Sequence, residues 1–592
     1  MSINNNINAL RDQLFQHQLD AFVIPGSDPH QSEYVADHWK GRQWISGFTG
    51  SAGNVVVTPS HAGLWTDSRY FIQAARELKG TPMKLHQLKI PHTPEYINWI
   101  LENVKEGGTV GCDGALFSVG QIRRMEKVLS IKSITVDYSK DLLSPIWKNR
   151  KPLPANEIFE HRVKFAGKNR ATKIEMIRSK MKAYSADYHL VSTLDDIAWI
   201  FNIRSSDVES NPVSIAYAVI GLKKAYLFAD KKKVSPKLQR TLEKDGIVLK
   251  PYPSVFSFLK KIAPPKMILT DLSTTNMQCY DAMNENQIIN QPTISTHLKA
   301  QKNKTEIKHL KNAMIKDGIA LTRLYLWLEK TLEETTVTEV EVAQKLSSLR
   351  AEQGGYHGES FAAIVGYKAN GAIVHYRPEE GICATIKKDG ILLLDSGGQY
   401  DDGTTDITRT VAFGKPTAEQ KRNFTLVLKG HIGLADLKFP RGTRGHQIEV
   451  LARQHLWKEG LNYGHGTGHG VGFFLNVHEG PQAISSGLTG KAATVIEEGM
   501  LTSNEPGFYK EGEYGIRIEN LVLTVKGQKT PYGQFLEFES VTLFPIDKNL
   551  VEHALLTKRE VEWLADYHRE VYEKLSPHLN PEEKAWLEEK CS

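Results

Sequence analysis

Two acidic residues lie in neighbouring strand-like runs with turn residues between them. Asp395 follows the apolar run ILLL, Asp406 precedes the run ITRTV, and glycines and aspartates fill the interval. A hairpin that turns between Tyr400 and Asp401 would place the two carboxylates opposite each other, with Cβ atoms about 4.5–5.5 Å apart. Carboxylates that close repel each other unless a shared proton or a metal ion lies between them.

The same construction recurs downstream. Glu505 and Glu519 are equally distant from Gly512, so a hairpin that turns at Gly512 again opposes two carboxylates. In the second strand, Arg517 and Glu519 would face one side and the neighbouring isoleucines the other. Arg517 would then either pair with the neighbouring carboxylates or contact a substrate, and the sequence leaves both alternatives open.

A glycine-rich segment, Tyr463–Gly472, lies between the two acidic pairs. Glycine at every second position disfavours a helix and lets the backbone approach a site closely. In an extended chain, His465 and His469 would fall on the same face, and His478 follows soon after. One imidazole with four carboxylates is a mostly oxygen ligand set, which favours Mn²⁺, with Zn²⁺ or Co²⁺ as alternatives.

Four carboxylates also balance the charge of two divalent metal ions. Two such ions about 3.5–4 Å apart can bridge one water and generate a hydroxide nucleophile near neutral pH. Taken singly, each motif has an ordinary explanation as a turn cap, a surface loop or a flexible turn. Two acidic pairs around a histidine–glycine motif together indicate a metal centre. Glu479 and Arg377 are interpreted as solvated charges.

Short strands and glycine-rich turns are expected from about Phe361 to Phe544, and helices on either side of them. Apolar spacing predicts an amphipathic helix over Glu306–Leu332, where Gly318 allows a break. Capping boxes predict further helices after Thr338 and after Thr557, and the run NPEE near the end of the chain starts another.

The first half of the chain contains two similar blocks of short apolar strands and amphipathic helices. Strand-like runs at Leu19–Ile24 and Tyr188–Val191 begin them, which suggests two related α/β domains. The basic, proline-containing stretch Lys148–Asn156 is a plausible linker, and a polar boundary falls near Leu298–Lys304. Although 592 residues correspond to about four average domains, the patterns favour three, at 1–150, 155–298 and 300–592.

Composition excludes several classes of protein. Hydrophobic residues make up 40% and charged residues 24%, and the net charge of +6 is small for this length. This is ordinary globular usage, with no argument for nucleic acid or an acidic membrane as a partner. The four cysteines are far apart, and we see no secretory h-region and no run of 18 apolar residues. A cytoplasmic protein is therefore expected.

In their order along the chain, these motifs resemble the pita-bread metallopeptidases, and specifically the three-domain cytosolic X-Pro aminopeptidases of the aminopeptidase P family. The resemblance covers nearly the whole length, and it rests on the segments DSGGQYDDGTTDITRT, GHGTGHGVG, NEPG, GIRIEN, SGFTGSAG, DSRYF, DDIAWIFNIR, NPV and ANGAIVHY. It implies an α/β plus α+β fold: two creatinase-like N-terminal α/β domains, then a pita-bread catalytic domain with a helical C-terminal tail.

The resemblance also implies roles for single residues. Asp406 and Glu519 would bridge two metal ions, and Glu505 would hold one ion and shuttle a proton. His375 and His478 would contact the substrate and the tetrahedral intermediate, and His465 would line the proline pocket. The five implied metal ligands are Asp395, Asp406, His469, Glu505 and Glu519.

The implied activity is release of the N-terminal residue from peptides with proline second, by attack of a hydroxide that bridges the two metal ions. A homodimer is expected from the resemblance. Three alternatives remain: an X-Pro dipeptidase, a non-catalytic peptide- or histone-binding module, and a creatinase-like hydrolase that uses no metal. The complete ligand set argues against the last two.

Overall fold

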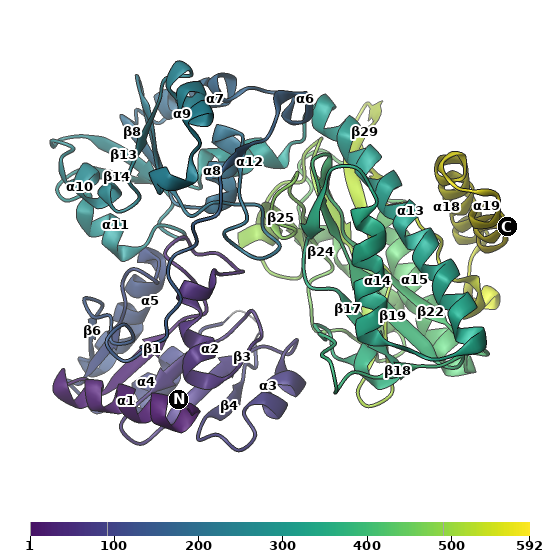
Figure 1. The fold of residues 1–592 in the computed structure, drawn as a ribbon, viewed down its shortest axis with the longest axis horizontal. Coiled ribbons are helices and arrows are strands. Elements are labelled where there is room, and N and C mark those ends of the chain that lie inside the picture. The colour runs from purple at the N-terminus through teal and green to yellow at the C-terminus, as the bar shows by residue number, and fades with distance from the viewer. Residues whose placement is uncertain (1, 91–92, 489) are drawn as a thin grey trace. The chain divides into compact units, whose positions relative to one another are not determined.

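The computed structural model describes residues 2–90, 93–488 and 490–592, and the chain forms two compact units (Figure 1). The first unit comprises Met1–Arg162 and Lys168–Ser295, and the second comprises Val163–Gly167 and Thr296–Ser592. The first predicted N-terminal domain lies wholly in the first unit, and so does the second, apart from Val163–Gly167 and residues 296–298. The boundaries predicted for the three domains stay a prediction.

The first unit contains two six-stranded mixed sheets. The strand order of the first sheet is β4-β3-β2-β1-β5-β6, and that of the second is β12-β11-β10-β8-β13-β14. The strands of the first sheet are β1 (Ala21–Ile24), β2 (Asn54–Val57), β3 (Ala62–Thr66), β4 (Lys84–Gln87), β5 (Thr109–Cys112) and β6 (Thr135–Asp137). Those of the second are β8 (Tyr188–Val191), β10 (Tyr217–Gly221), β11 (Ala225–Phe228), β12 (Ile247–Lys250), β13 (Met267–Thr270) and β14 (Gln287–Asn290).

The two sheets have the same topology, strand for strand. In each sheet the first strand pairs antiparallel with the second, and parallel with the strand on its other side. The remaining pairs also agree in direction. Two related α/β domains, inferred from the similar apolar blocks, are therefore confirmed.

Helices join and flank these strands (Figure 1). Leu10 of the first helix and Phe22 of β1 share one apolar core, and Val255 and Leu190 share the core of the second sheet. The main helices are α1 (Ile3–Gln16), α2 (Gly41–Ser46), α3 (Phe71–Glu77), α4 (Glu95–Asn103), α5 (Val119–Leu129), α7 (Arg170–Ala183), α8 (Leu194–Phe201), α9 (Pro236–Lys244), α10 (Ser254–Lys260) and α11 (Met277–Ala282). Helix α12 (Ile294–Ala300) leads into the second unit.

The second unit combines long helices with several small sheets. Its principal helices are α13 (Lys304–Glu334), α14 (Glu339–Ala351), α15 (Ala418–Ala435), α17 (Val450–Trp457), α18 (Lys558–Leu575) and α19 (Pro581–Cys591). The strands of one sheet are β23 (Lys438–Pro440), β30 (Gly533–Ser540), β29 (Asn520–Thr530), β26 (Leu501–Asn504), β24 (Gly468–Gly470) and β25 (Glu479–Ile484), in spatial order. Other sheets contain β17 (Ile364–Tyr367), β19 (Ile391–Ser396) and β22 (Ile407–Ala412); β16 (Tyr356–Glu359), β20 (Gly398–Tyr400) and β21 (Gly403–Thr404); and β27 (Gly507–Lys510) with β28 (Tyr514–Arg517).

The predicted helices of this unit are confirmed, but the expectation of short strands and turns alone from about Phe361 to Phe544 is wrong, because α15 and α17 lie inside that segment. Capping boxes begin α14 at Thr338 and α18 at Thr557, and Asn580 caps α19. Helix α13 runs without a break through Gly318. A Cβ at Gly318 would lie 2.5 Å from the carbonyl oxygen of Leu543, so this glycine permits close packing against the helix rather than interrupting it.

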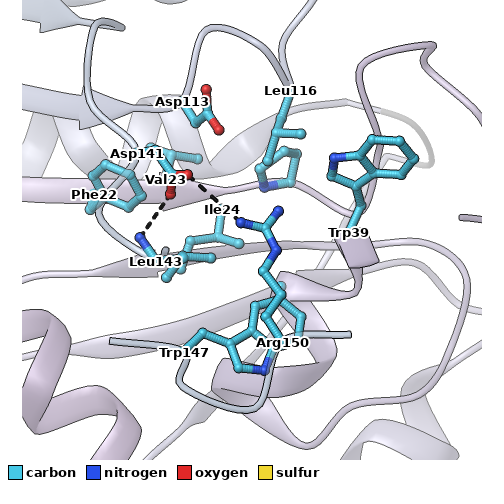
Figure 2. A pocket seen from close by; sticks show the side chains of 12 residues that line it. Phe22, Val23, Ile24, Trp39, Asp113, Leu116, Asp141, Leu143, Trp147 and Arg150 are labelled. Carbon is cyan, nitrogen blue, oxygen red and sulfur yellow. Dashed lines mark hydrogen bonds and ion pairs between the residues drawn. The ribbon is translucent and has the colours of Figure 1, made fainter. Parts of the chain in front are cut away.

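A pocket opens beside β1 in the first unit (Figure 2). Aromatic and aliphatic side chains line it together with Asp113, Asp141 and Arg150. All the residues that line it lie between positions 22 and 150, whereas every predicted site residue lies between 375 and 519. Among the helices of the described residues, none combines the length and the apolar character needed to cross a membrane.

Candidate metal centre

The first acidic pair lies on one hairpin, but its predicted register is wrong by two residues. Asp395 of β19 pairs with Thr408 of β22, not with Asp406. The turn is centred between Asp401 and Asp402, one residue later than expected. Because side chains alternate with a period of two, this error leaves both acidic residues on the same face.

Side chains of α13 explain the position of this turn. The Asp402 carboxylate contacts Nδ1 of His309 at 2.8 Å, accepts a hydrogen bond from Asn312 Nδ2 at 2.9 Å, and pairs with Lys316. Gly403 follows with φ +147°, a conformation that favours glycine. The contacts with α13 depend on tertiary structure, so local turn propensity could not predict them.

The second hairpin has the predicted register. Gly507 pairs with Arg517, and the turn falls at Gly512, where φ is +74°. Glu505 lies two residues before the first strand and Glu519 two residues after the second. Both carboxylates therefore occupy corresponding positions at the open end of the hairpin.

His469 lies between the two acidic pairs. Its Nε2 is 3.6 Å from Asp406 Oδ2 and 3.5 Å from Glu505 Oε1. Candidate ligand atoms of Asp406, His469 and Glu519 all lie within 4.8 Å of one another. The Thr408 hydroxyl donates to Glu519 Oε2 at 2.7 Å and orients that carboxylate. The fold thus gathers residues that are up to 113 positions apart in the sequence.

Of the other predicted histidines, His465 and His478 contact residues of this cluster, and His375 follows a residue that is hydrogen-bonded to Arg517. His465 Nδ1 is 3.9 Å from Glu505 Oε2, and its Nε2 is 2.8 Å from the Tyr509 hydroxyl. The His478 ring packs edge-on against the His469 ring, with centroids 4.3 Å apart. His375 lies in a turn whose preceding residue, Val374, accepts a hydrogen bond from Arg517 at 3.4 Å.

Asp395 is held by Arg517, so the ion pair predicted as one of the two alternatives for Arg517 is present. Arg517 Nη2 donates to Asp395 Oδ2 at 2.6 Å, and Arg517 Nη1 donates to the Tyr509 hydroxyl at 2.6 Å. The second carboxylate oxygen, Asp395 Oδ1, is buried without a hydrogen-bond partner among the described residues. A buried acceptor of this kind is costly unless something positive binds it.

The acidic cluster is electrostatically unfavourable by itself. Burial, together with the neighbouring carboxylates, raises the pKa values of Asp406 and Glu519 well above their ordinary range. Burial likewise raises the pKa of Glu505 to about 7, although the Arg517 charge opposes this. A divalent cation fits this set, because it would bind the unpaired oxygen and compensate the negative charges.

Two residues of the site were missed or misread in the sequence. Glu479 was interpreted as solvated, but the side chain is only 1% exposed and pairs with Lys299 and Lys302. Tyr509 was not singled out, although hairpin register places it diagonally across from Arg517 and so within contact distance. Arg377 is exposed, as predicted.

Family models match almost the whole chain. "Metallopeptidase family M24" matches residues 308–526. "Creatinase/Prolidase N-terminal domain" matches residues 6–143 and 149–306, and "C-terminal region of peptidase_M24" matches residues 534–592. The chain therefore belongs to metallopeptidase family M24, with creatinase-like N-terminal domains before the pita-bread domain.

Within that family, the chain is similar to Xaa-Pro aminopeptidases. It is 41% identical to a probable Xaa-Pro aminopeptidase P of Laccaria bicolor, over 98% of this chain and 92% of the relative. It is 42% identical to Xaa-Pro aminopeptidase 1 of Dictyostelium discoideum, over 98% and 94%. A crystal structure of X-prolyl aminopeptidase from Caenorhabditis elegans, described as a cytosolic enzyme with a di-nuclear active site, is 33% identical, with TM-score 0.95 and full coverage of both chains.

Proposed function

We propose that this protein is a metal-dependent aminopeptidase that releases the N-terminal residue from peptides with proline at the second position. The observation that carries the proposal is the group of acidic side chains, buried Asp395, Asp406 and Glu519 and half-buried Glu505, that the fold gathers with His469, in a chain about 40% identical to Xaa-Pro aminopeptidases. The similarity to these relatives extends over the N-terminal domains as well as the catalytic domain. It therefore supports aminopeptidase activity in particular, and not only the metal-dependent hydrolysis shared by the family.

The proposed ligands are those five residues, and the proposed cofactor is a pair of divalent metal ions. A mostly oxygen ligand set supports Mn²⁺, with Zn²⁺ or Co²⁺ as alternatives. The related nematode enzyme is described as di-nuclear, which supports two ions. When bound, such ions polarise a carbonyl group and lower the pKa of water.

The chain itself supplies proton transfer and substrate contacts in this proposal. Glu505 is the carboxylate that we propose takes up and returns a proton, because it lies among the candidate ligands, with its Oε1 3.5 Å from His469 Nε2. We propose that it passes a proton to the proline nitrogen as the peptide bond breaks. His375 and His478 would contact the substrate and stabilise developing negative charge. His465, held by Tyr509, would line the proline pocket.

The nearest alternative is an X-Pro dipeptidase, which performs the same chemistry on dipeptides alone. Metal-loaded protein should be incubated with Gly-Pro and with Arg-Pro-Pro, and the products should be identified by mass spectrometry. Release of arginine from the tripeptide supports the aminopeptidase. Rapid cleavage of Gly-Pro with no attack on the tripeptide would establish the dipeptidase.

Two further alternatives require no metal-dependent peptidase activity. A peptide-binding module would leave both substrates intact, and a creatinase-like hydrolase would keep its activity after chelation. Loss of X-Pro cleavage on chelation and its return with Mn²⁺ would eliminate both.

Assembly and location complete the proposal. We propose a cytoplasmic homodimer, supported by the family resemblance and by the related enzyme described as cytosolic. The mass of the protein in solution by light scattering, against 66.5 kDa for one chain, tests the dimer.

A further inference from the structure

A buried charge triad lies directly beside the proposed substrate-contacting histidine. Glu479 is the residue after His478, and its carboxylate is enclosed by two lysine side chains. Lys302 Nζ is 2.6 Å from Glu479 Oε1, and Lys299 Nζ is 3.2 Å from Glu479 Oε2. All three side chains are 1% exposed. Two ammonium groups and one carboxylate are thus removed from water together.

Lys302 is fixed by backbone contacts as well as by charge. Lys302 Nζ also donates to the carbonyl oxygen of Lys299 at 3.0 Å. The Lys302 amide donates to the carbonyl oxygen of Gly499 at 2.8 Å, and Gln301 bridges to Met500. Residue 500 directly precedes β26, the strand that leads to Glu505. The segment that carries the lysines is therefore anchored to the strand that ends at the metal centre.

Glu479 is also joined to the strand that carries His469. Glu479 opens β25 and pairs across the sheet with Gly470 of β24, the residue after His469. A Cβ at Gly470 would lie 2.6 Å from the Glu479 carbonyl oxygen, so the two backbones are in close contact. One residue before Glu479, the His478 ring packs against the His469 ring.

From this arrangement we infer that Glu479 is a positioning residue, clamped by Lys299 and Lys302 so that the His478 imidazole is held against His469. The inference rests on the proposed function, because His478 acts on substrate only if the chain is an X-Pro peptidase. The position of the His478 ring can nevertheless be observed without activity.

The physical argument is that a charged carboxylate between two buried ammonium groups has very little freedom. Moving it would leave at least one buried charge uncompensated, which is strongly unfavourable. Because adjacent residues share a peptide unit, a fixed Glu479 restricts the backbone of His478. Groups that orient the residues of a metal site in this way typically change activity by about 10- to 100-fold when removed.

The test uses Glu479→Gln, which keeps the shape of the side chain and removes its charge. We expect kcat/KM on an X-Pro tripeptide to fall about 10- to 100-fold, with metal content unchanged. Glu479→Asp, which retains the charge, should recover most of the loss. In the His478→Ala background, Glu479→Gln should lower kcat/KM by less than about 3-fold, because residues that act as one unit are not additive. If the losses of kcat/KM from His478→Ala and Glu479→Gln multiplied in the double variant, the inference would be overturned.

A structural readout separates this inference from the proposed function. Crystal structures of metal-free wild-type protein and Glu479→Gln should show the His478 ring displaced from its 4.3 Å packing against His469 in the variant only. An unmoved ring would overturn the inference even if activity fell. If the wild-type protein cleaves no X-Pro peptide, the proposed function fails, and ring displacement still decides the positioning role.

Two further variants guard against a purely structural effect. Lys302→Met leaves a neutral Lys299–Glu479 pair and should fold, with an intermediate loss of kcat/KM. Glu560→Gln breaks another partly buried pair of the same unit, in which Lys429 Nζ lies 2.6 Å from Glu560 Oε2. We expect it to lower the melting temperature with little change in kcat/KM. Equal losses of activity in Glu560→Gln and Glu479→Gln would refute a positional role.

Discussion

Arg517 donates to one oxygen of Asp395 at 2.6 Å, while the other oxygen of that carboxylate is buried without a hydrogen-bond partner among the described residues. The guanidinium therefore binds the side of Asp395 away from the unpaired oxygen. It also donates to Tyr509, which in turn contacts His465. One buried cation thus links a proposed metal ligand to a proposed substrate-binding histidine.

Arg517 should matter most when the metal is absent. In the metal-free protein its charge compensates buried carboxylates that otherwise repel one another, so we expect Arg517→Gln to cost about 3–5 kcal/mol of stability after chelation. The loss should be smaller with Mn²⁺ bound, because the metal then supplies positive charge. Arg350→Gln is the matched control, since Arg350 is fully buried and pairs with Asp317. Arg350→Gln should lower the melting temperature by the same amount with and without metal. If the loss caused by Arg517→Gln were also independent of metal, the role given to Arg517 would be contradicted.

Asp406→Asn should remove metal binding and activity together. The asparagine keeps the shape of the side chain but loses a charge at the point where candidate ligands of three residues converge. We expect X-Pro cleavage to fall by more than about 100-fold, the upper range for groups that only support ligands. Metal content is measured by mass spectrometry. Asp401→Asn, in the nearby turn and paired with His357, is the control; full activity in Asp406→Asn would refute the ligand assignment.

Asp113 in the pocket of the first unit should make stability depend on pH (Figure 2). Burial raises its pKa from 3.8 to about 6. The folded protein therefore holds this proton more tightly than the unfolded chain, and the contribution to stability is lost as pH rises from about 4 through about 6. Asp113→Asn cannot ionise, so it should be more stable than wild type by about 2 kcal/mol at pH 7.5, allowing for partial exposure, and nearly equal at pH 4.

Melting temperatures across this pH range test the sign. Asp187→Asn provides a control of opposite direction, because a hydrogen bond from the Met267 amide lowers the pKa of Asp187. Stability from a lowered pKa is present above the ordinary value, so this variant should be less stable than wild type at pH 7.5. If both substitutions changed the stability at pH 7.5 in the same direction, the directions assigned to the two pKa shifts would be contradicted.

Gly318→Ala should destabilise the protein although it lies inside a helix. Helix propensity alone predicts a gain of about 1 kcal/mol for this change. The added Cβ would instead lie 2.5 Å from the Leu543 carbonyl oxygen and 2.9 Å from Leu575 Cδ2, which forces the packing apart. Gly433→Ala in α15 is the control, because its nearest neighbour is at 3.5 Å, an ordinary contact. Denaturant unfolding should give a lower free energy of unfolding for Gly318→Ala than for wild type. The value for Gly433→Ala should be equal to or higher than that of wild type.

Local patterns in the sequence determined much of this protein. Capping boxes at Thr338 and Thr557 fix helix starts through hydrogen bonds within four residues, so no distant partner is needed. The turn at Gly512 was predictable because its positive φ favours glycine and the register follows from it. The alternation of side chains also placed each acidic pair on one face.

Only the tertiary structure decided the rest. The register of the first hairpin depends on Asp402 and its partners in α13, about 90 residues away in sequence. The burial of Glu479 depends on Lys299 and Lys302, which are more than 170 positions earlier, so charge alone suggested a solvated residue. Which oxygen of Asp395 stays unpaired follows from where Arg517 reaches it. Local geometry is encoded by neighbours in the chain, whereas charge compensation in a buried site is set by residues that meet only on folding.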